Sequence, residues 1–483
     1  MEEKTASPKS NDSWTGADVI AATDGRLVCG EPSRQFSAVG IDSRMFEPSA
    51  CYVAIVGKTH DGHEFCRQVV DAGGRGLLVA EESVERFPID TWRRRAVFCA
   101  AVADTTRALG DLASWHRDRQ SVQVVAITGS CGKTTTRDMT TSVLRQRYRT
   151  LSSKKNFNNE IGLPLTLLDL DPQHEWAVAE LGMNHLGEIA RLGDICSPDI
   201  GVITNVGAAH LEGLGTVDNV AAAKAELLAG IRKGGTAVLN ADDHRVRAMA
   251  PHAAGRVLFF GGSDEADIRS RNVSPSGLGT AFELVLPGGE IPVFLRGPGL
   301  FMVSNALAAA AVGHAAGFSL EEIKAGLEAF EPVPGRMNLV ETMSGFHIID
   351  DTYNANPVSM TAAISTLASV KGEGRGMVVL GDMFELGPRS KEFHHALGVV
   401  AAQSGAVRVY ATGTFAGEVV AGALDAQMDP EDVIASSQAD ILVDLKKRIA
   451  PGDWVLVKGS RAAEMEKIVS GLVAWAGGEK RKA

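Results

Sequence analysis

Short apolar runs alternate with amphipathic segments along most of the chain. Runs such as VQVVAIT, TAVLN and GMVVL are rich in β-branched residues, which is typical of buried strands. Segments such as DTTRALGDLASWHRDRQ place apolar residues three and four positions apart, which is typical of helices. This alternation predicts an α/β fold with mostly parallel sheets.

The chain has 483 residues, so a typical domain of roughly 150 residues predicts about three compact units. We expect a solvated tail at residues 1–13 and a small α/β domain at residues 14–119. In that domain GADVIAATDG predicts a short helix ended by glycine, and ACYVAIVG and RGLLVA predict two strands joined through a helix.

The second predicted domain spans residues 120–333. VQVVAITG followed by TTTRDMTTSVLRQRY predicts strand, loop and helix, and WAVAELG, DIGVITNVG, TAVLN and RVLFF predict further strands of a mostly parallel sheet. VSNALAAAAVGHAAG and LEEIKAGLEAF predict helices. EPVPGRMN then breaks any regular element and marks the second boundary.

The third predicted domain spans residues 334–483. FHIID, GMVVLGD, AVRVYATG and DWVLVKG alternate with helical segments, as in a doubly wound, Rossmann-like parallel sheet. No G-x-G-x-x-G follows its first strand, so the sequence gives no support for dinucleotide binding.

Composition narrows the possible partners. The 48 basic and 59 acidic side chains give a net charge of −11, which argues against nucleic acid or anionic lipid as a partner. The six cysteines form no C-x-x-C pair, the N-terminus lacks the features of a secretory signal, and no apolar run reaches the ~18 residues of a membrane span. We therefore expect a soluble protein of the reducing cytoplasm.

The sharpest chemical signal is Gly129-Ser130-Cys131-Gly132-Lys133-Thr134-Thr135, between a predicted strand and a predicted helix. Backbone N–H groups of such a loop and the helix dipole can hold phosphate oxygens. Lys133 would reach the outer phosphates, and Thr134 would bind Mg²⁺. Position 127 is isoleucine, so the full G-x-x-x-x-G-K spacing is missing and the loop is a shortened variant. The alternative is a glycine turn with a chance lysine.

Three further residues are candidates with ordinary alternatives. Glu180 closes the strand AVAELG and could bind Mg²⁺, but a strand-end glutamate is more often solvated. His210 follows VITNVGAAH and alone would be a helix-start or packing residue. Lys224 lies in NVAAAKAELL, where a surface lysine would be ordinary. No Asn-Lys-x-Asp tetrad is present, which disfavours a GTPase.

Taken together, these motifs resemble the Mur ligase family. TGSCGKTTT, KKNFNNEIGLP, AELGMN, ITNVGAAHLEGLGT, the AAAKAEL helix, PGRMN and DDTYNANP occur in the family's order across nearly the whole chain. Within the family, DDTYNANPVSM, GDMFELG and VLVKGSR resemble the members that add D-alanyl-D-alanine. The Asp-Asn-Pro-Arg signature of the diaminopimelate-adding members is not found. Cys131 stands where relatives often have asparagine or valine.

The resemblance implies roles in the central and third domains. Glu180 and His210 would bind Mg²⁺, with two ions expected, and Lys224 would be carbamylated by CO₂ to bridge the metals. Asn305 would approach adenine, Arg336 the phosphates, and Asp351, Tyr353 and Asn354 the ribose. Asn156 and Asn159 would position phosphate and substrate. Without the resemblance, the last six would be ordinary capping or turn residues.

The resemblance also implies substrate sites in the outer domains. Asp42-Ser43-Arg44, followed by Gly57 and Asp61-Gly62-His63, resembles the family's UDP-sugar-binding domain, where Ser43 and Arg44 would contact the UDP substrate. A surface salt bridge is the alternative for Arg44. At the end of DWVLVKG, Lys458, Ser460 and Arg461 would grip the incoming dipeptide, although helix-start polarity is an equal alternative for Ser460.

The implied reaction is ATP-dependent addition of D-alanyl-D-alanine to UDP-N-acetylmuramoyl-tripeptide through an acyl phosphate, in a monomer that pivots near residues 333–336. Two alternatives stay open. One is a different amide ligase of the Mur or folylpolyglutamate type, and the other is a non-catalytic nucleotide-sensing module. The sequence leaves open whether the tripeptide ends in diaminopimelate or lysine.

Overall fold

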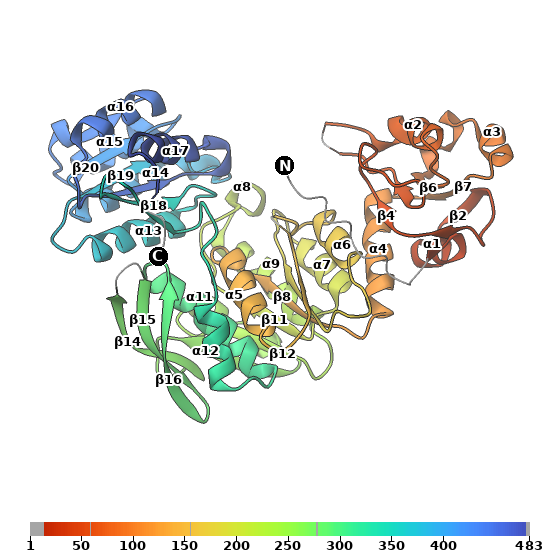
Figure 1. The fold of residues 1–483 in the computed structure, drawn as a ribbon, viewed down its shortest axis with the longest axis horizontal. Coiled ribbons are helices and arrows are strands. Elements are labelled where there is room, and N and C mark those ends of the chain that lie inside the picture. Colours follow the sequence, from red (N-terminus) through yellow and green to blue (C-terminus); the bar gives the residue numbers. More distant parts are fainter. Residues whose placement is uncertain (1–13, 58, 155, 277–278, 480–483) are drawn as a thin grey trace. The chain divides into compact units, whose positions relative to one another are not determined.

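The computed structural model describes residues 14–57, 59–154, 156–276 and 279–479 (Figure 1). The chain forms two compact units. The first consists of Met1–Ala126, Tyr148–Gly182 and Glu188–Asp199, and the second of Ile127–Arg147, Met183–Gly187 and Ile200–Ala483. The predicted tail at residues 1–13 lies outside the described residues.

The first unit contains a five-stranded sheet in the order β2-β7-β6-β5-β4. Strand β2 pairs antiparallel with β7, and the other neighbours are parallel. Apolar side chains pack on both faces of this sheet. The strands are β2 (Arg26–Cys29), β4 (Val39–Gly40), β5 (Cys51–Val53), β6 (Gly76–Ala80) and β7 (Phe98–Val102).

The helices of the first unit include the predicted ones. The predicted connection between two strands is α2, and the helix before the boundary is α4, capped by Asp104. Helix α1 ends at an aspartate in the left-handed conformation, Asp24, with φ 49°, one residue before the predicted glycine. The bounds are α1 (Gly16–Thr23), α2 (Cys66–Asp71), α3 (Ile89–Arg94), α4 (Thr105–Asp118), α6 (Gly162–Leu167) and α7 (Glu188–Cys196).

Two parallel strands, β9 (Thr150–Ser152) and β10 (Trp176–Glu180), also belong to the first unit. Strand β8 (Gln123–Thr128) begins in the first unit, and its last two residues belong to the second. Its final carbonyl, on Thr128, accepts the N–H of Thr204 at 3.0 Å, just past the end of β11.

In the second unit the strands follow the order β16-β15-β14-β13-β12-β11. The pairs from β11 to β14 are parallel, as predicted for a mostly parallel sheet. The parallel strands are β11 (Ile200–Ile203), β12 (Thr236–Asn240), β13 (Arg256–Gly261) and β14 (Ile268–Ser276). The helices are α5 (Lys133–Leu144), α8 (Leu211–Leu214), α9 (Val217–Gly230), α10 (His244–Arg247), α11 (Leu300–Ala315) and α12 (Leu320–Glu328).

The sequence analysis missed an antiparallel extension of this sheet. Strand β14 pairs with β15 (Gly279–Leu286), and β15 pairs with β16 (Gly289–Arg296). Buried and partly exposed positions alternate along β15, whereas β14 is polar and contains Pro275. A strand with so few apolar residues gives little periodic signal.

The last sheet has six strands in the order β17-β18-β22-β19-β20-β21. Only β17 pairs antiparallel, and the four predicted strands are β18, β19, β20 and β22. The strands are β17 (Asn338–Glu341), β18 (His347–Asp351), β19 (Gly376–Leu380), β20 (Arg408–Ala411), β21 (Val433–Ala435) and β22 (Trp454–Lys458).

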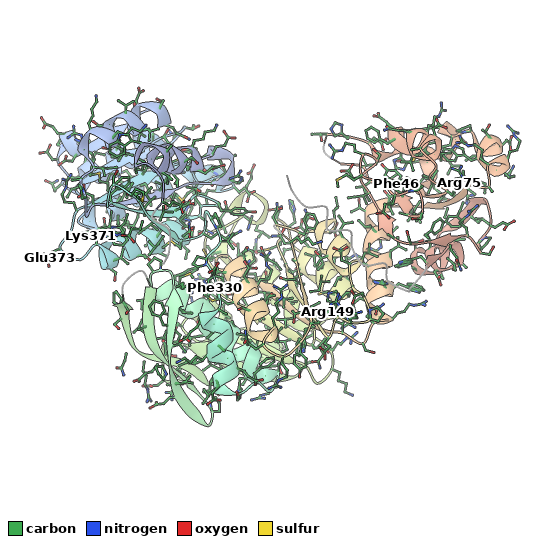
Figure 2. The ribbon with its side chains drawn as sticks, in the orientation of Figure 1. Phe46, Arg75, Arg149, Phe330, Lys371 and Glu373 are labelled. Carbon is green, nitrogen blue, oxygen red and sulfur yellow. The ribbon has the colours of Figure 1, made fainter. Side chains whose placement is uncertain are left out.

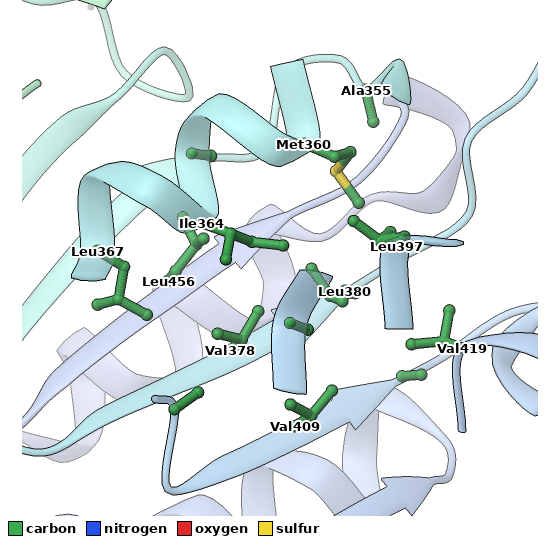
Figure 3. Packing of buried hydrophobic residues seen from close by; sticks show 14 of the residues in the cluster. Ala355, Met360, Ile364, Leu367, Val378, Leu380, Leu397, Val409, Val419 and Leu456 are labelled. Atoms are coloured by element: carbon green, nitrogen blue, oxygen red, sulfur yellow. The ribbon is translucent and has the colours of Figure 1, made fainter. Parts of the chain in front are cut away.

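Helices cover both faces of this sheet, which confirms the predicted doubly wound, Rossmann-like arrangement. On one face Met360, Ile364 and Leu367 of α13 pack against Val378 and Leu456, as Figure 3 shows. The other face packs against α16 and α17. The helices are α13 (Pro357–Val370), α14 (Ser390–Gln403), α15 (Ala416–Asp425), α16 (Gln438–Arg448) and α17 (Glu466–Trp475).

The predicted boundaries at residues 119/120 and 333/334 stay predictions. Each falls between sheets, because the three large sets of strands begin at residues 26, 123 and 338. In the described part of the chain, no helix combines the length and the apolar character that crossing a bilayer would require.

Candidate functional site

Residues 129–132, here called the glycine loop, join β8 to α5. Gly132 has φ 82° and precedes the first residue of the helix. A Cβ on Gly132 would lie 2.3 Å from Oδ1 of Asn305, and one on Gly129 would lie 1.9 Å from Oγ1 of Thr204. Both positions therefore need glycine, and the phosphate-binding role of the loop stays a prediction.

The N-terminus of α5 follows the glycine loop directly. The N–H groups in the first turn of a helix have no partner within the helix, and the dipole there favours anions. Lys133 folds back over the loop, and its Nζ donates to the carbonyl of Gly129 at 2.7 Å. Thr134 is buried in the same turn. This arrangement can hold phosphate groups.

Residues 205–207, which follow β11, form hydrogen bonds with the glycine loop. The side chain of Asn205 accepts the N–H of Cys131 at 2.9 Å and donates to the carbonyl of Cys131 at 3.1 Å. Oγ of Ser130 accepts the N–H of Gly207 at 2.9 Å. The sequence analysis assigned no role to Asn205, although it lies in the ITNVG motif at a strand end.

Asn305 of α11 lies beneath the glycine loop. It is 2% exposed, and its Oδ1 accepts the hydroxyl of Thr136 at 3.2 Å. Its Nδ2 is buried and has no hydrogen-bond acceptor among the described residues. A buried donor without an acceptor lowers the free energy of unfolding, unless a bound ligand accepts its hydrogen bond. The predicted contact of Asn305 with a nucleotide stays a prediction.

Lys224 lies on α9 and is 1% exposed, so the alternative of a surface lysine is excluded. Burial, followed by the charge of Lys133, holds the pKa of Lys224 well below its ordinary value of 10.5. Among the described residues no hydrogen bond or ion pair reaches its amine. A neutral, desolvated amine is the form that reacts with CO₂.

His210 caps the N-terminus of α8 in the left-handed conformation, with φ 55°. Its Nδ1 lies 2.7 Å from Oε2 of Glu385, which also has a positive φ, 62°. Two non-glycine residues in this region are strained, and such strain gathers at functional sites. Glu385, in the GDMFELG motif, is a second residue that the sequence analysis missed.

Glu180 ends β10 in the first unit and is 3% exposed, which excludes a solvated glutamate. Its Oε1 accepts the amide of Asn158 at 2.9 Å. Asn158 lies between the two asparagines predicted to bind substrate. Of these, Asn159 accepts the N–H of Gly162, the first residue of α6, at 2.8 Å, and Asn156 is exposed.

Arg44 is exposed and forms an ion pair with Asp42 at 2.7 Å. The guanidinium holds the pKa of Asp42 at about 2, and Ser43 between them is partly exposed. Phe46, labelled in Figure 2, packs edge-on against Tyr52 with 5.8 Å between ring centroids and anchors this loop. The pair matches the alternative of a surface salt bridge, and the UDP-binding role of Arg44 stays a prediction.

His63, in the predicted UDP-sugar-binding motif Asp61-Gly62-His63, is buried, and both of its ring nitrogens form hydrogen bonds. Its Nε2 accepts the N–H of Ala80 at 2.9 Å, so Nδ1 carries the proton that it donates to Asp61 at 2.6 Å. Both ring nitrogens are therefore used within the domain. His63 holds the loop rather than offering a donor to a ligand.

In the last domain, two loops bring predicted nucleotide-binding residues together. Gly335 donates its N–H to buried Asp350 at 2.9 Å, and its carbonyl accepts the N–H of Tyr353. The guanidinium of Arg336 lies 4.0 Å from the ring centroid of Tyr353. The N–H of Met337 bonds Asp351. Residues far apart in the chain thus share one edge of the sheet.

Lys458 and Asp351 end the neighbouring strands β22 and β18. Nζ of Lys458 donates to Oδ2 of Asp351 at 2.5 Å and to the carbonyl of Asn354 at 2.8 Å, and Lys458 is 2% exposed. Ser460 is buried and accepts the N–H of Phe384. Arg461 is exposed and pairs with Glu466. The predicted dipeptide contacts of Lys458, Ser460 and Arg461 stay predictions.

Among the described residues, no group of three or more histidines, cysteines, aspartates or glutamates is arranged to hold a metal. The predicted ligands are instead one hydroxyl (Thr134), one imidazole (His210), one carboxylate (Glu180) and the amine of Lys224, which CO₂ can convert to a carbamate. The oxygen donors of this set suit Mg²⁺, which usually keeps several waters and binds substrate phosphates.

Two family models match the chain. Residues 127–313 match the Mur ligase middle domain, and residues 335–461 match the domain described as Mur ligase, glutamate ligase domain. The glycine loop, His210 and Lys224 lie in the first match, and the loops of Arg336 and Asp351 lie in the second.

Curated relatives match over most of their length. The chain is 36% identical over 437 residues to UDP-N-acetylmuramoyl-tripeptide–D-alanyl-D-alanine ligase of Escherichia coli K12, covering 90% of this chain and 93% of the relative. It is 35% identical to the enzyme of the same name from Bacillus subtilis 168, with the same coverage.

Solved structures show the same architecture. A crystal structure of MurF from Acinetobacter baumannii superimposes with a TM-score of 0.87 at 33% identity, covering 96% of this chain and 99% of that chain. MurF ligase from Thermotoga maritima in complex with ADP gives 0.80 at 29% identity, covering 90% and 96%. The predicted three-domain α/β architecture is confirmed.

Proposed function

This chain belongs to the Mur ligase family, and from that premise we propose that it uses ATP to add D-alanyl-D-alanine to UDP-N-acetylmuramoyl-tripeptide. The relatives that share a third of its residues over nearly their full length carry this activity in their names. The product is the UDP-linked pentapeptide used in cell-wall synthesis. The reaction is that of a peptide ligase that forms ADP.

The observation that carries this proposal is the glycine loop at the N-terminus of α5. Its two glycines are required by close contacts with Thr204 and Asn305, and Lys133, the first residue of α5, folds back over the loop to the carbonyl of Gly129. Lys133 and the first turn of α5 can neutralise charge on a transferring phosphoryl group, which is the main contribution of protein to such reactions.

The chemistry requires activation, because a carboxylate has no good leaving group for amide formation. A carboxylate oxygen of the tripeptide attacks the γ-phosphorus of ATP. The bond from that phosphorus to the β,γ-bridging oxygen breaks, which gives an acyl phosphate and ADP. Lys133 and the first turn of α5 stabilise the negative charge on the phosphoryl oxygens.

Amide formation follows. The amine nitrogen of D-alanyl-D-alanine attacks the acyl carbon and gives a tetrahedral intermediate. The carbon–oxygen bond to phosphate then breaks, inorganic phosphate leaves, and the nitrogen loses its proton. Exclusion of water from the acyl phosphate protects it from hydrolysis.

We propose that Mg²⁺ is held by Thr134, His210 and Lys224, with Glu180 as a further ligand, and that it supplies charge neutralisation for the phosphates. Two ions are proposed. Lys224 fits a carbamate because its amine is buried, has a pKa held well below its ordinary value, and has no partner among the described residues. The carbamate would replace the amine with the oxygen donors that Mg²⁺ prefers.

We also propose the remaining roles predicted from the sequence. Asn305, Arg336, Asp351, Tyr353 and Asn354 would bind the nucleotide. The contacts of Arg336 with Tyr353, and of Asp351 with Met337, support a shared site for three of them, Arg336, Asp351 and Tyr353. A cytoplasmic location and a monomeric state stay predictions.

The test is release of inorganic phosphate with ATP, Mg²⁺, UDP-N-acetylmuramoyl-tripeptide and D-alanyl-D-alanine, omitting each in turn. We expect release only when all are present, and a product whose mass equals tripeptide plus dipeptide minus water. Nucleotide binding without release would favour a sensing module. Release with another amine, such as glutamate, in place of the dipeptide would favour a different ligase.

A parallel reaction with UDP-N-acetylmuramoyl-tripeptides ending in diaminopimelate or in lysine decides the accepted substrate. The two differ by a carboxyl group on the third side chain, so the site that accepts one leaves a charge unpaired with the other. The preferred substrate is the one with the higher kcat/KM.

A further inference from the structure

The glycine loop is short, with only residues 129–132 between β8 and α5. Isoleucine occupies position 127, where a longer phosphate-binding loop would have its first glycine. Two of the four loop residues are glycines, which lose the most conformational freedom when they become ordered. Something outside the loop must therefore hold it in one conformation before ATP arrives.

The segment that follows β11 provides these contacts. The side chain of Asn205 bonds both backbone polar groups of Cys131: Oδ1 accepts its N–H at 2.9 Å, and Nδ2 donates to its carbonyl at 3.1 Å. The backbone carbonyl of Asn205 accepts the N–H of Ser130 at 3.0 Å. The hydroxyl of Thr204 donates to the same Cys131 carbonyl at 2.6 Å.

Asn205 is itself held by the next strand. Asn240, the last residue of β12, donates from Nδ2 to the carbonyl of Thr204 at 2.8 Å. Asp243 accepts the N–H of Val206 at 2.7 Å. The residues on either side of Asn205 are thus fixed to a neighbouring strand end, which gives its side chain a rigid base.

We infer that Asn205 is a positioning residue that preorganises the glycine loop for the triphosphate by binding both backbone polar groups of Cys131. The N–H groups of Ser130 and Cys131 are both directed at Asn205, so phosphate recognition falls to the remaining N–H groups of the loop and those of the first turn of α5. A loop ordered in advance loses less entropy when the ligand binds. This inference rests on the proposed function, because it takes ATP as the ligand of the loop.

The first test replaces Asn205 with alanine. We expect the Kd for ADP with Mg²⁺, measured by calorimetry, and the KM for ATP to rise about tenfold, because two hydrogen bonds to the loop are lost. The KM for UDP-N-acetylmuramoyl-tripeptide should stay within about twofold of wild type. A purely structural loss would change both substrates alike. Equal ADP affinity in N205A and wild type would overturn the inference.

The matched control is Ser142→Ala on α5, the helix that follows the glycine loop. Its hydroxyl donates to the carbonyl of Gly326 at 2.6 Å, so the variant also removes a side-chain bond to a backbone carbonyl. Position 142 is ten residues from Gly132, about 15 Å along the helix. ADP affinity should stay at the wild-type value, and a tenfold loss in S142A would overturn the assignment to Asn205.

Hydrogen exchange on the free enzyme tests the loop without any nucleotide. Peptides that contain residues 130–134 should exchange faster in N205A than in wild type, and S142A should match wild type there. Unchanged exchange in N205A would overturn the inference. If wild type failed to bind ADP, the proposed function would fail, while this comparison would still decide whether Asn205 holds the loop.

Thr204→Val is a second, nearly isosteric variant that removes only one of the two donors to the Cys131 carbonyl. We expect its ADP affinity to fall about threefold. Since Thr204 and Asn205 act on the same peptide group, the double variant should lose less than the product of the two single losses. A double loss equal to that product would contradict a shared action through Cys131.

Discussion

Lys224 shows at the residue scale how surroundings set chemistry. A lysine on an alanine-rich helix is ordinarily a charged surface residue, but here it is 1% exposed and close enough to Lys133 for their charges to repel. Both effects favour the neutral amine. The glycine loop shows the same dependence, because Gly132 is required by the position of Asn305 as well as by its own φ.

Replacing Lys224 with alanine should abolish ligase activity, because the proposed carbamate oxygens are lost. Phosphate release should return in part when a small carboxylate such as acetate or formate is supplied at high concentration. The control is Lys233→Ala, an exposed lysine just beyond the same helix, which should keep wild-type activity. Full activity of K224A without added carboxylate would rule out the carbamate.

Gly132→Ala and Gly234→Ala form a matched pair. Their φ angles are 82° and 84°, but a Cβ at Gly234 has no atom within 4 Å, whereas at Gly132 it would meet Asn305 at 2.3 Å. Gly234→Ala should cost about 1–2 kcal/mol of unfolding free energy from backbone strain alone. Gly132→Ala should cost about 1–3 kcal/mol more, from the displaced neighbour.

Urea unfolding measures both costs, and calorimetry with ADP adds the functional readout. Gly234→Ala should bind ADP like wild type, because it lies away from the glycine loop. Gly132→Ala should lose ADP binding. Equal unfolding free energies for the two variants would show that the contact with Asn305 is unimportant.

At the element scale, the loop after β19 is held by groups from several elements. Asp382 accepts the N–H groups of Thr414 and Phe415 at 2.7 and 3.0 Å. His394 of α14 accepts the N–H of Met383 at 2.9 Å through Nε2, and its Nδ1 donates to the carbonyl of Ser390 at 2.7 Å. These contacts position the segment that carries Glu385 toward His210.

The loop should weaken in acid because His394 must stay neutral to accept that bond. Burial lowers the pKa of His394 below 6.5, against the opposing effects of the hydrogen bond to the Ser390 carbonyl and of the charges of Asp382 and Glu418. Its contribution to stability is therefore complete above pH 6.5 and is lost as the pH falls through the folded-state pKa. The slope is at most about 1.4 kcal/mol per pH unit for one proton.

The measurement is urea unfolding of wild type and His394→Gln between pH 8 and pH 5. The difference at pH 8 gives the pH-independent cost of the substitution. Below pH 6.5 the wild-type free energy of unfolding should fall more steeply than that of the variant. Parallel curves would mean that the pKa of His394 is the same in the folded and unfolded states.

On the scale of the whole molecule, the chain forms two compact units and three large sets of strands. The five-stranded sheet has apolar side chains packed on both faces, and so does the six-stranded sheet. A region with its own core can unfold separately, so a single two-state transition is not expected for a chain of this size.

Scanning calorimetry should therefore resolve at least two transitions. ADP with Mg²⁺ at about 100 times its Kd should stabilise the unit that contains the glycine loop by about 2.7 kcal/mol and raise the temperature of that transition. The transition of the five-stranded sheet should not move. One transition that shifts as a whole would show that the two units unfold together.

The sequence by itself determined the order of most buried strands and helices and the chemical type of the central site. Strand, glycine loop and helix at residues 123–144 are fixed by neighbouring residues, so their pattern is visible locally. The four strands predicted in the last domain are also found. The strands β14 to β16 were missed. Polar residues and Pro275 hide the strand pattern of β14, whereas the alternation along β15 was visible and was overlooked.

Only the tertiary structure decided which side chains reach that site and in what state. Asn205 meets Cys131 across 74 residues, and Lys458 meets Asp351 across 107. Burial lowers the pKa of Lys224 well below its ordinary value, and contacts with Ala80 and Asp61 use both ring nitrogens of His63. Such contacts depend on which strand ends lie side by side, and a buried position depends on what packs over it, so no local pattern of residues records either.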